Sequence, residues 1–345
     1  RIGAMWWTAL YPLMKITQLA ANVILAQLLS PVHFGLVALG NSLMQGLNKF
    51  SELGLRPAIL THERGDEATF LNTAWTLQVL RGAGLWVIAT ALAWPAARIY
   101  EEPFLIALLP VLGAVSLING FRSTSLITLN RHLDERPQAL LELAKSLLAR
   151  IAMVGFAVVY PSPWASVTAT VVCILINVIL SHRLDKTFSN RFAWDRQAVG
   201  MLINFGIWVT LGTIIAFFNQ QIDRLLIPLL DNFGILGVYS VAYMVAHMPQ
   251  ELFATLVGKV MLPVMSQVHR DDHARFAERV EKIRKSIMPA AIFFCLGAGA
   301  AAPYFFGWLY DWDFYEAVWI APTLVGVTWI RLLNGPANQA LLAMG

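Results

Sequence analysis

The sequence predicts an all-α polytopic membrane protein, and its composition, its hydropathy and the form of its apolar runs carry that prediction. Of its 345 residues, 57% are apolar and 13% are charged, whereas an average soluble domain carries about 25% charged residues. The mean hydropathy is +0.61, which is more apolar surface than a water-soluble fold of this size hides. The apolar runs are continuous and do not alternate, which excludes the strands of a β-barrel. Soluble enzymes, nucleic-acid-binding proteins and disordered scaffolds do not fit this composition.

Ten membrane spans follow in order from stretches without Asp, Glu, Lys or Arg, because about 20 apolar residues cross the bilayer core. The run Ile16–Asn48 supplies the first two spans, with a turn at Ser30-Pro31. The run Ile151–His182 supplies another two, and Gln197–Ile222 and Ser286–Tyr310 supply one each. Weaker stretches complete the set. The predicted spans are residues 5–29, 35–60, 73–94, 104–129, 139–160, 164–182, 199–229, 235–262, 286–310 and 317–342.

Basic residues lie almost entirely in alternate connections between these spans. One set of connections, at residues 1–4, 61–72, 130–138, 183–198 and 263–285, holds fourteen Lys or Arg residues. The other set, at residues 30–34, 95–103, 161–163, 230–234 and 311–316, holds only Arg98. Positively charged loops remain on the cytoplasmic side of a membrane. The sequence therefore predicts a multi-pass protein with its N-terminus in the cytoplasm.

A short internal repeat relates the first two spans to the seventh and eighth. The segments Leu28–Val37 and Leu229–Val238 each end one long span, turn, and begin the next span beside a glycine. Repeats of the same orientation imply two lobes related by an axis along the membrane normal, as in transporters. We therefore expect an N-terminal six-helix lobe at residues 1–196 and a C-terminal lobe at residues 197–345, of which the first four helices are present.

Five segments carry a resemblance to a known family: Ala26–Pro31, Phe34–Leu39, Phe50–Leu55, Gln221–Ile227 and Leu236–Tyr243. In these segments the sequence resembles bacterial polysaccharide exporters, the lipid-linked oligosaccharide flippases of the multidrug/oligosaccharidyl-lipid/polysaccharide superfamily. The resemblance implies a transporter, not an enzyme, in the bacterial inner membrane. Its implied activity is to flip an undecaprenyl-pyrophosphate-linked repeat unit of lipopolysaccharide, O-antigen or exopolysaccharide by alternating access. The family has more spans than the ten predicted here, so the second lobe is expected to be incomplete.

The expected partners are the polyprenyl-pyrophosphate-linked glycan, membrane lipids, and a polysaccharide polymerase with its co-polymerase; no nucleic acid is expected. Two alternatives stay open, a multidrug antiporter of the same superfamily and a membrane glycan polymerase or ligase. A basic surplus inside the spans argues against the first, and short outer loops argue against the second. The cysteines Cys173 and Cys295 form no CxxC motif and no P-loop is present, so neither a metal nor a cofactor is expected.

Polar residues inside the spans define the predicted site. Ten are basic and four are acidic, and such residues are costly in a membrane unless they face a cavity or a partner. Basic groups suit a pyrophosphate, and amides and tyrosine suit a sugar. Structural pairing, snorkelling to headgroups and interhelical hydrogen bonding are the alternatives. The predicted substrate-binding residues are Lys15, Gln18, Asn22, Asn41, Gln45, Lys49, Arg81, Tyr243 and Arg331.

Two polar stripes at helical spacing support this prediction. One follows the second span through Asn41, Gln45, Asn48, Glu52 and Arg56, and the other follows the eighth span through Tyr239, Tyr243, His247 and Glu251. The predicted ion-coupling residues are Glu251 and Asp223, because a buried carboxylate is able to bind a proton or a cation. Arg224 beside Asp223 makes Glu251 the stronger candidate.

Overall fold

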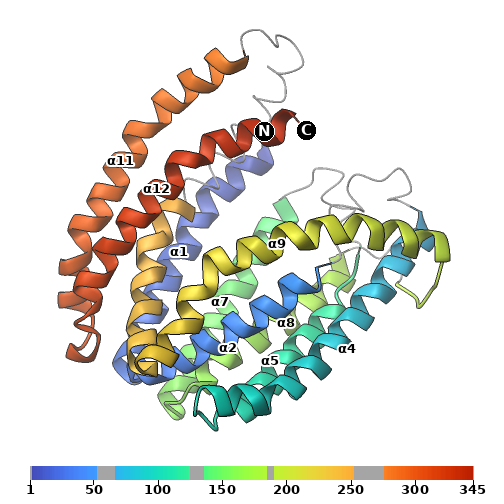
Figure 1. The fold of residues 1–345 in the computed structure, drawn as a ribbon, viewed down its shortest axis with the longest axis horizontal. Helices are drawn as coiled ribbons and strands as arrows, with labels where there is room; N and C mark the ends of the chain where they lie inside the picture. The colour runs from blue at the N-terminus through green and yellow to red at the C-terminus, as the bar shows by residue number, and fades with distance from the viewer. Residues whose placement is uncertain (1, 53–66, 125–135, 185–189, 252–275, 345) are drawn as a thin grey trace. The chain divides into compact units, whose positions relative to one another are not determined.

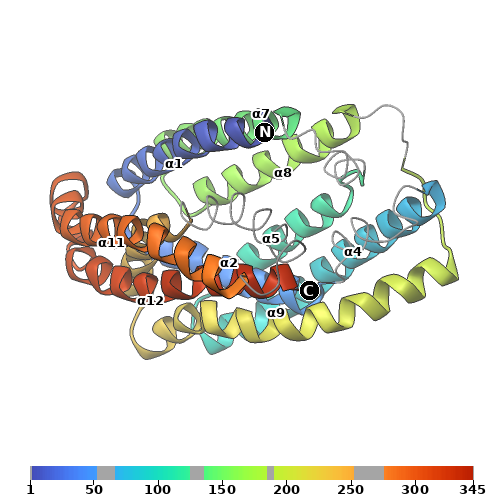
Figure 2. The same ribbon diagram turned by 90° about the horizontal axis from the view of Figure 1, so that it is seen from above.

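The computed structural model of the protein describes residues 2–52, 67–124, 136–184, 190–251 and 276–344 (Figures 1 and 2). Within these ranges the chain is helical and contains no strand, as the sequence predicts. The helices are α1 (Ile2–Leu28), α2 (Pro31–Phe50), α4 (Ala68–Ile99), α5 (Leu105–Gly120), α7 (Arg136–Val159), α8 (Trp164–Leu184), α9 (Arg196–Leu230), a helix at residues 233–251, α11 (Phe276–Leu309), the short η3 (Trp312–Phe314) and α12 (Ala317–Met344).

The described helices include three that are long and apolar enough to cross a membrane. They are Ala68–Ile99, Trp164–Arg183 and Met288–Leu309, and Leu105–Gly120 is a shorter apolar helix. The all-α membrane fold is therefore confirmed, and the count of ten spans stays a prediction.

Two tight turns lie where the sequence predicts them. α1 ends at Leu28 and α2 begins at Pro31, a residue that is favoured at the start of a helix. α9 ends at Leu230, and Asn232 caps the following helix because its Oδ1 accepts a hydrogen bond from the Ile235 backbone N–H at 2.9 Å. A Cβ atom at Gly234 would lie 2.9 Å from that oxygen, so glycine leaves room for the cap.

The predicted span 35–60 does not run as one unbroken helix. α2 ends at Phe50, where the Ser51 hydroxyl donates to the Leu47 carbonyl at 2.8 Å and offers the backbone an alternative to continued helix. Glu52 therefore lies just beyond the helix, and Arg56 falls outside the described residues. α5 likewise ends at Gly120, before the end of the predicted span 104–129. Residues 125–129 of that span and residues 252–262 of the eighth span lie outside the described ranges.

The chain forms two compact units. The first comprises Arg1–Leu10 with Val32–Leu236, and the second comprises Tyr11–Pro31 with Gly237–Gly345. Most of α1 therefore belongs to the second unit, and α9 belongs to the first. The predicted lobes at residues 1–196 and 197–345 describe a sequence repeat, and they stay a prediction.

In the first unit, α4 and α5 lie side by side (Figures 1 and 2). Glycines line their contact: a Cβ atom at Gly82 would lie 2.8 Å from the Ser116 carbonyl oxygen, and one at Gly120 would lie 3.1 Å from that of Gln78. Small residues allow helix backbones to approach this closely in membranes. α7 packs along α8 in the same unit.

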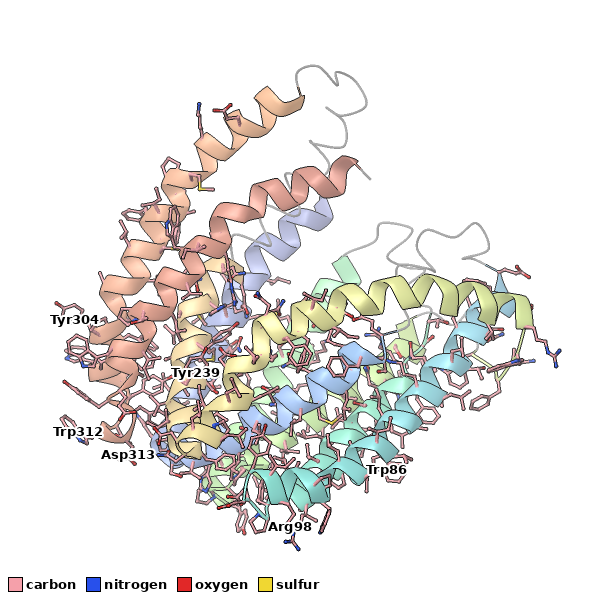
Figure 3. All side chains as sticks on the ribbon, in the orientation of Figure 1. Trp86, Arg98, Tyr239, Tyr304, Trp312 and Asp313 are labelled. Carbon is pink, nitrogen blue, oxygen red and sulfur yellow. The ribbon has the colours of Figure 1, made fainter. Side chains whose placement is uncertain are left out.

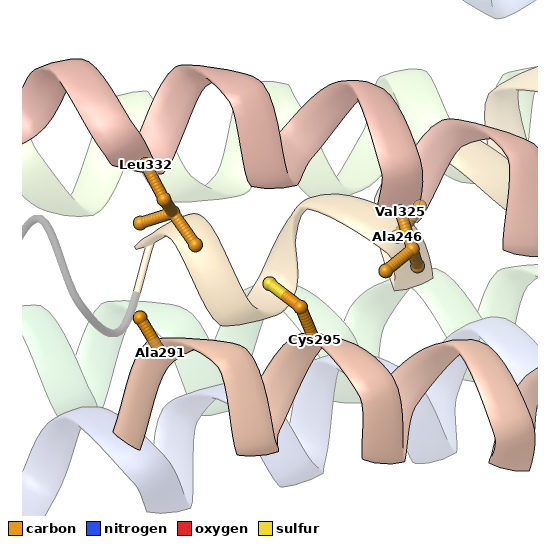
Figure 4. Close-up of a cluster of buried hydrophobic side chains, with 5 residues drawn as sticks. All are labelled: Ala246, Ala291, Cys295, Val325 and Leu332. Atoms are coloured by element: carbon orange, nitrogen blue, oxygen red, sulfur yellow. The ribbon is translucent and has the colours of Figure 1, made fainter. Parts of the chain in front are cut away.

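In the second unit, α11 and α12 pack together with the helix at residues 233–251. Figure 4 shows the buried cluster that joins them, formed by Ala246, Ala291, Cys295, Val325 and Leu332. The connection between α11 and α12 carries exposed side chains, including Trp312 and Asp313, and Tyr304 projects from the nearby end of α11 (Figure 3). Exposed aromatic residues at helix ends suit a membrane–water interface.

Candidate functional site

Two clusters of polar side chains in the described helices contain predicted site residues, and each unit holds one of them. The amide cluster of the first unit consists of Ser42, Gln45, Gln221 and Arg224. The charged cluster of the second unit consists of Lys15, Tyr243, His247, Glu251 and Arg331.

In the amide cluster, Gln221 of α9 joins three partners. The Ser42 hydroxyl donates to Gln221 Oε1 at 3.0 Å, and Gln221 Nε2 donates to Gln45 Oε1 at 3.0 Å. Arg224 Nη1 also donates to Gln221 Oε1, at 3.2 Å. Gln221 is only 6% exposed, and these bonds offset the cost of burying its amide. The cluster therefore fixes α9 against α2 and orients Gln45.

A small pocket of about 90 Å³ opens beside the amide cluster, with room for roughly three water molecules. Its polar lining is Gln45, Lys49, Thr213, Gln220 and Gln221, and Phe217 supplies an apolar wall. Lys49 Nζ lies 3.2 Å from Glu52 Oε2, and both side chains are partly exposed. The pocket therefore offers amide groups and an ammonium group to a polar ligand.

In the charged cluster, α1 contacts the helix at residues 233–251 through an ion pair between Lys15 and Glu251. Lys15 Nζ also donates to Gln18 Oε1 at 3.3 Å, and Asn22 Nδ2 donates to the Gln18 backbone carbonyl at 2.9 Å. The predicted residues Lys15, Gln18 and Asn22 are therefore linked along α1, and the predicted coupling acid has a base beside it.

His247 links the other two members of the charged cluster. Arg331 Nη1 lies 3.1 Å from His247 Nε2, and His247 Nδ1 lies 3.2 Å from the Tyr243 carbonyl oxygen. The imidazole stacks on the Tyr243 ring with centroids 3.5 Å apart and planes at 17°. Tyr239, labelled in Figure 3, packs 6.0 Å from Tyr243 in turn. The contacts place Tyr239, Tyr243 and His247 on one face, as their spacing predicts.

Arg81 of α4 bonds to the end of α2. Its Nε donates to the Ser51 hydroxyl at 3.1 Å, and its Nη2 donates to the Asn48 carbonyl at 2.8 Å. The last carbonyls of a helix lack partners within the helix, so Arg81 caps α2. Among the roles that the sequence leaves open for Arg81, these contacts favour structural pairing.

Asn41 and Asp223, two further predicted residues, belong to the first unit. Asn41 is half-buried on α2, one turn before Gln45, and the Asp223 carboxylate accepts a hydrogen bond from the Arg224 backbone N–H at 2.9 Å. Sequence reasoning omitted His247, Gln221 and Thr213 from the predicted site. The adjacent amides Gln220-Gln221 inside apolar α9 were a signal for Gln221.

A family model described as polysaccharide biosynthesis protein matches residues 24–312 of this chain. The chain belongs to the polysaccharide biosynthesis protein family. Membership confirms the resemblance that the five sequence segments carry, and the match includes every predicted site residue except four. Those four are Lys15, Gln18 and Asn22 of α1 and Arg331 of α12.

Three relatives extend the comparison. The succinoglycan biosynthesis transport protein ExoT of Rhizobium meliloti (strain 1021) is 24% identical over 329 residues, covering 92% of this chain and 66% of ExoT. The lipopolysaccharide biosynthesis protein WzxC of Escherichia coli (strain K12) is 19% identical, covering 99% of this chain and 69% of WzxC. The teichuronic acid biosynthesis protein TuaB of Bacillus subtilis (strain 168) is 19% identical, covering 85% of this chain and 61% of TuaB. The chain thus spans about two thirds of the length of these relatives.

This chain is also similar to a solved structure, the crystal structure of MATE in the bent conformation. The alignment covers 99% of this chain and 79% of the MATE chain, with 15% sequence identity and a TM-score of 0.48.

Proposed function

We propose that the protein flips an undecaprenyl-pyrophosphate-linked oligosaccharide from the cytoplasmic to the outer face of the bacterial inner membrane. The observation that carries this proposal is the family match over residues 24–312 in a helical membrane protein. The relatives' names support it, since they refer to succinoglycan transport and to lipopolysaccharide and teichuronic acid biosynthesis. The glycan is a repeat unit of a lipopolysaccharide, O-antigen or exopolysaccharide.

The two polar clusters supply the groups that such a substrate needs. Lys49 in the pocket and Arg331 in the charged cluster offer charged donors to a pyrophosphate. Gln45, Asn41 and Gln18 offer amides to sugar hydroxyls, and Tyr243 offers a ring face. Lys15 and Asn22 complete the proposed substrate-binding set, and Arg81 contributes by holding the end of α2 beside Lys49.

We further propose that the protein is a transporter and not an enzyme, with its N-terminus in the cytoplasm. Two lobes would alternate access to the bound lipid-linked glycan, which a polymerase and its co-polymerase would then receive on the outer side. Glu251, with Asp223 as the second candidate, would couple this cycle to a proton or cation gradient. Lys15 pairs with the Glu251 carboxylate, so a proton or cation that binds to Glu251 would weaken this ion pair.

The test measures surface glycan in a strain that lacks the native gene and carries Lys49→Gln or Arg331→Gln. Each charge-assisted phosphate contact contributes about 1.5–3 kcal/mol, so each loss should weaken substrate binding about ten- to hundredfold and reduce surface glycan. Lys285→Gln is the matched control, because Lys285 is exposed at the start of α11 and pairs with Glu281. Wild-type glycan from both test variants, at equal membrane levels, would contradict the proposed substrate.

The multidrug alternative predicts a different result. A drug antiporter should raise the resistance of a sensitive strain to cationic compounds and should leave surface glycan unchanged when it is deleted. The relatives named for polysaccharide biosynthesis favour the flippase.

A further inference from the structure

A pocket of about 370 Å³ lies where α4 ends and α5 begins, in the first unit. This volume is within the range of small-ligand sites. The pocket is lined by Trp94, Ala97, Arg98, Glu101, Pro103 and Ile106. None of these residues belongs to the amide cluster, to the charged cluster or to the predicted site, so the proposed function leaves this pocket unexplained.

Two opposite charges line this pocket and do not pair with each other. Arg98 projects from the end of α4 (Figure 3), and its guanidinium carbon lies over the Trp94 ring, 5.1 Å from the ring centroid. Within the described part of the chain, neither the Arg98 guanidinium nor the Glu101 carboxylate takes part in a hydrogen bond or an ion pair. Both residues are exposed, so both charges are available to a ligand.

Glu101 occupies a position that ordinarily suits glycine. α4 ends at Ile99, and the Glu102 backbone N–H donates to the Ala97 carbonyl at 3.0 Å, a bond that closes a helix when a left-handed residue follows its cap. That residue is Glu101, with a φ of 53°, a conformation in which a side chain is strained and glycine is not. A carboxylate is also unfavourable at the negative end of a helix. Since no contact among the described residues offsets these costs, they point to a binding role for Glu101.

The two charges together indicate the chemistry of the ligand. The Arg98 guanidinium suits phosphate oxygens, because it is able to donate to two of them at once. The Glu101 carboxylate only accepts hydrogen bonds, so it suits an ammonium group, which only donates them. Trp94 and Ile106 are 61% and 49% exposed, and such side chains at a helix end suit the membrane–water interface. A ligand that fits all four residues joins a phosphate, an ammonium group and an apolar tail.

We propose that this pocket binds a phospholipid whose zwitterionic headgroup carries a primary ammonium group, as in phosphatidylethanolamine. The phosphate binds Arg98, the ammonium group binds Glu101, and the acyl chains pass Ile106 into the hydrocarbon. With the predicted orientation, this lipid belongs to the outer leaflet. The inference needs only the membrane fold and does not depend on the glycan that the protein carries.

Headgroup chemistry distinguishes this site from a general anion site. Phosphatidylglycerol carries the same phosphate without an ammonium group, so it satisfies Arg98 but not Glu101. Phosphatidylcholine carries a trimethylammonium group, which has no N–H to donate to the Glu101 carboxylate. We therefore expect phosphatidylethanolamine to bind about tenfold more tightly than either lipid, since one charge-assisted contact separates them.

The experiment titrates each of the three lipids into the purified protein in detergent and measures lipid occupancy by native mass spectrometry. Arg98→Gln should weaken the binding of all three lipids about tenfold. Glu101→Gln should remove the preference for phosphatidylethanolamine over phosphatidylglycerol and leave phosphatidylglycerol bound.

Two matched controls should keep the wild-type preference. Glu102→Gln changes the neighbouring carboxylate, which accepts a hydrogen bond from the Phe104 backbone N–H at 3.2 Å and does not line the pocket. Arg183→Gln removes an exposed arginine of α8 that also lies outside the pocket lining.

Three results would overturn the inference. The first is equal occupancy of phosphatidylethanolamine and phosphatidylglycerol on the wild-type protein, and the second is a wild-type preference in Glu101→Gln. The third is binding of glycerophosphoethanolamine, which has the headgroup without acyl chains, as tightly as the lipid, because it would assign the site to a free zwitterion. The wild-type comparison needs no variant, so it decides alone if a variant fails to fold. None of these results bears on the proposed function, which fails when deletion of the gene leaves surface glycan unchanged.

Discussion

At the residue scale, the structure divides the predicted basic residues by what they contact. Arg81 bonds to the end of α2, whereas Lys49 lines a pocket and Arg331 meets a histidine. The sequence places all three inside predicted spans and does not tell them apart, because spacing shows which residues share a face but not which neighbour they meet.

Replacing Arg81 should affect stability more than substrate binding. Arg81→Gln removes the charge-assisted bonds to Asn48 of α2 and to Ser51 just after it, and it should lower the free energy of unfolding by about 1–3 kcal/mol. Arg81→Lys should recover part of that loss, since it keeps the charge without the planar fork. Thermal unfolding of the purified variants in detergent measures this. A variant that melts like the wild type yet exports no glycan would return Arg81 to the substrate site.

Glu251 offers a second prediction at this scale. Glu251→Gln removes the carboxylate that pairs with Lys15, and transport should then cease to respond when the proton and sodium gradients are collapsed. The double variant Lys15→Gln with Glu251→Gln restores the charge balance and serves as the control for loss of the ion pair. A normal response of the single variant to both collapses would show that Glu251 has no coupling role.

At the element scale, the contact of α4 with α5 depends on glycine. A Cβ atom at Gly82 would lie 2.8 Å from a backbone oxygen of α5, whereas one at Gly84, two residues along the same helix, has no neighbour within 4 Å. The two positions are thus a matched pair that separates helix propensity from helix packing.

Gly82→Ala should push α5 away from α4 and destabilise the first unit by about 1–3 kcal/mol. Gly84→Ala should be neutral or stabilising by up to about 1 kcal/mol, because alanine favours helix. The comparison requires only the melting temperatures of both variants. Equal melting temperatures would contradict the close packing of these helices.

The sequence predicts most helix positions at this scale, because long apolar runs leave little choice of structure. It predicts the turns at residues 29–30 and 231–232 from local signals, namely Ser30-Pro31 and Asp231-Asn232. It fails at the end of α2, because that end depends on the Ser51 hydroxyl and on Arg81 from a distant helix. Gln221 was missed for the same reason, since its partners Ser42 and Gln45 lie far away in sequence.

At the scale of the whole molecule, the distribution of basic residues predicts the orientation in the membrane. In a variant without Cys173 and Cys295, single cysteines at positions 64, 131, 191 and 275 should react only with reagents that enter the cytoplasm. Cysteines at positions 101 and 312 should react from outside, because the outer connections hold only one base, Arg98. External labelling at position 191 would reverse the orientation and the direction of transport with it.

The central claim is that this protein itself moves a lipid-linked glycan across a membrane. The most direct measurement reconstitutes the purified protein in vesicles that contain a fluorescent polyprenyl-diphosphate oligosaccharide and follows its accessibility to an external quencher. We expect the protein to accelerate transfer between leaflets, and the Arg331→Gln variant to slow it about ten- to hundredfold relative to the Lys285→Gln control. Transfer no faster than in protein-free vesicles, with folded protein present, would contradict the account.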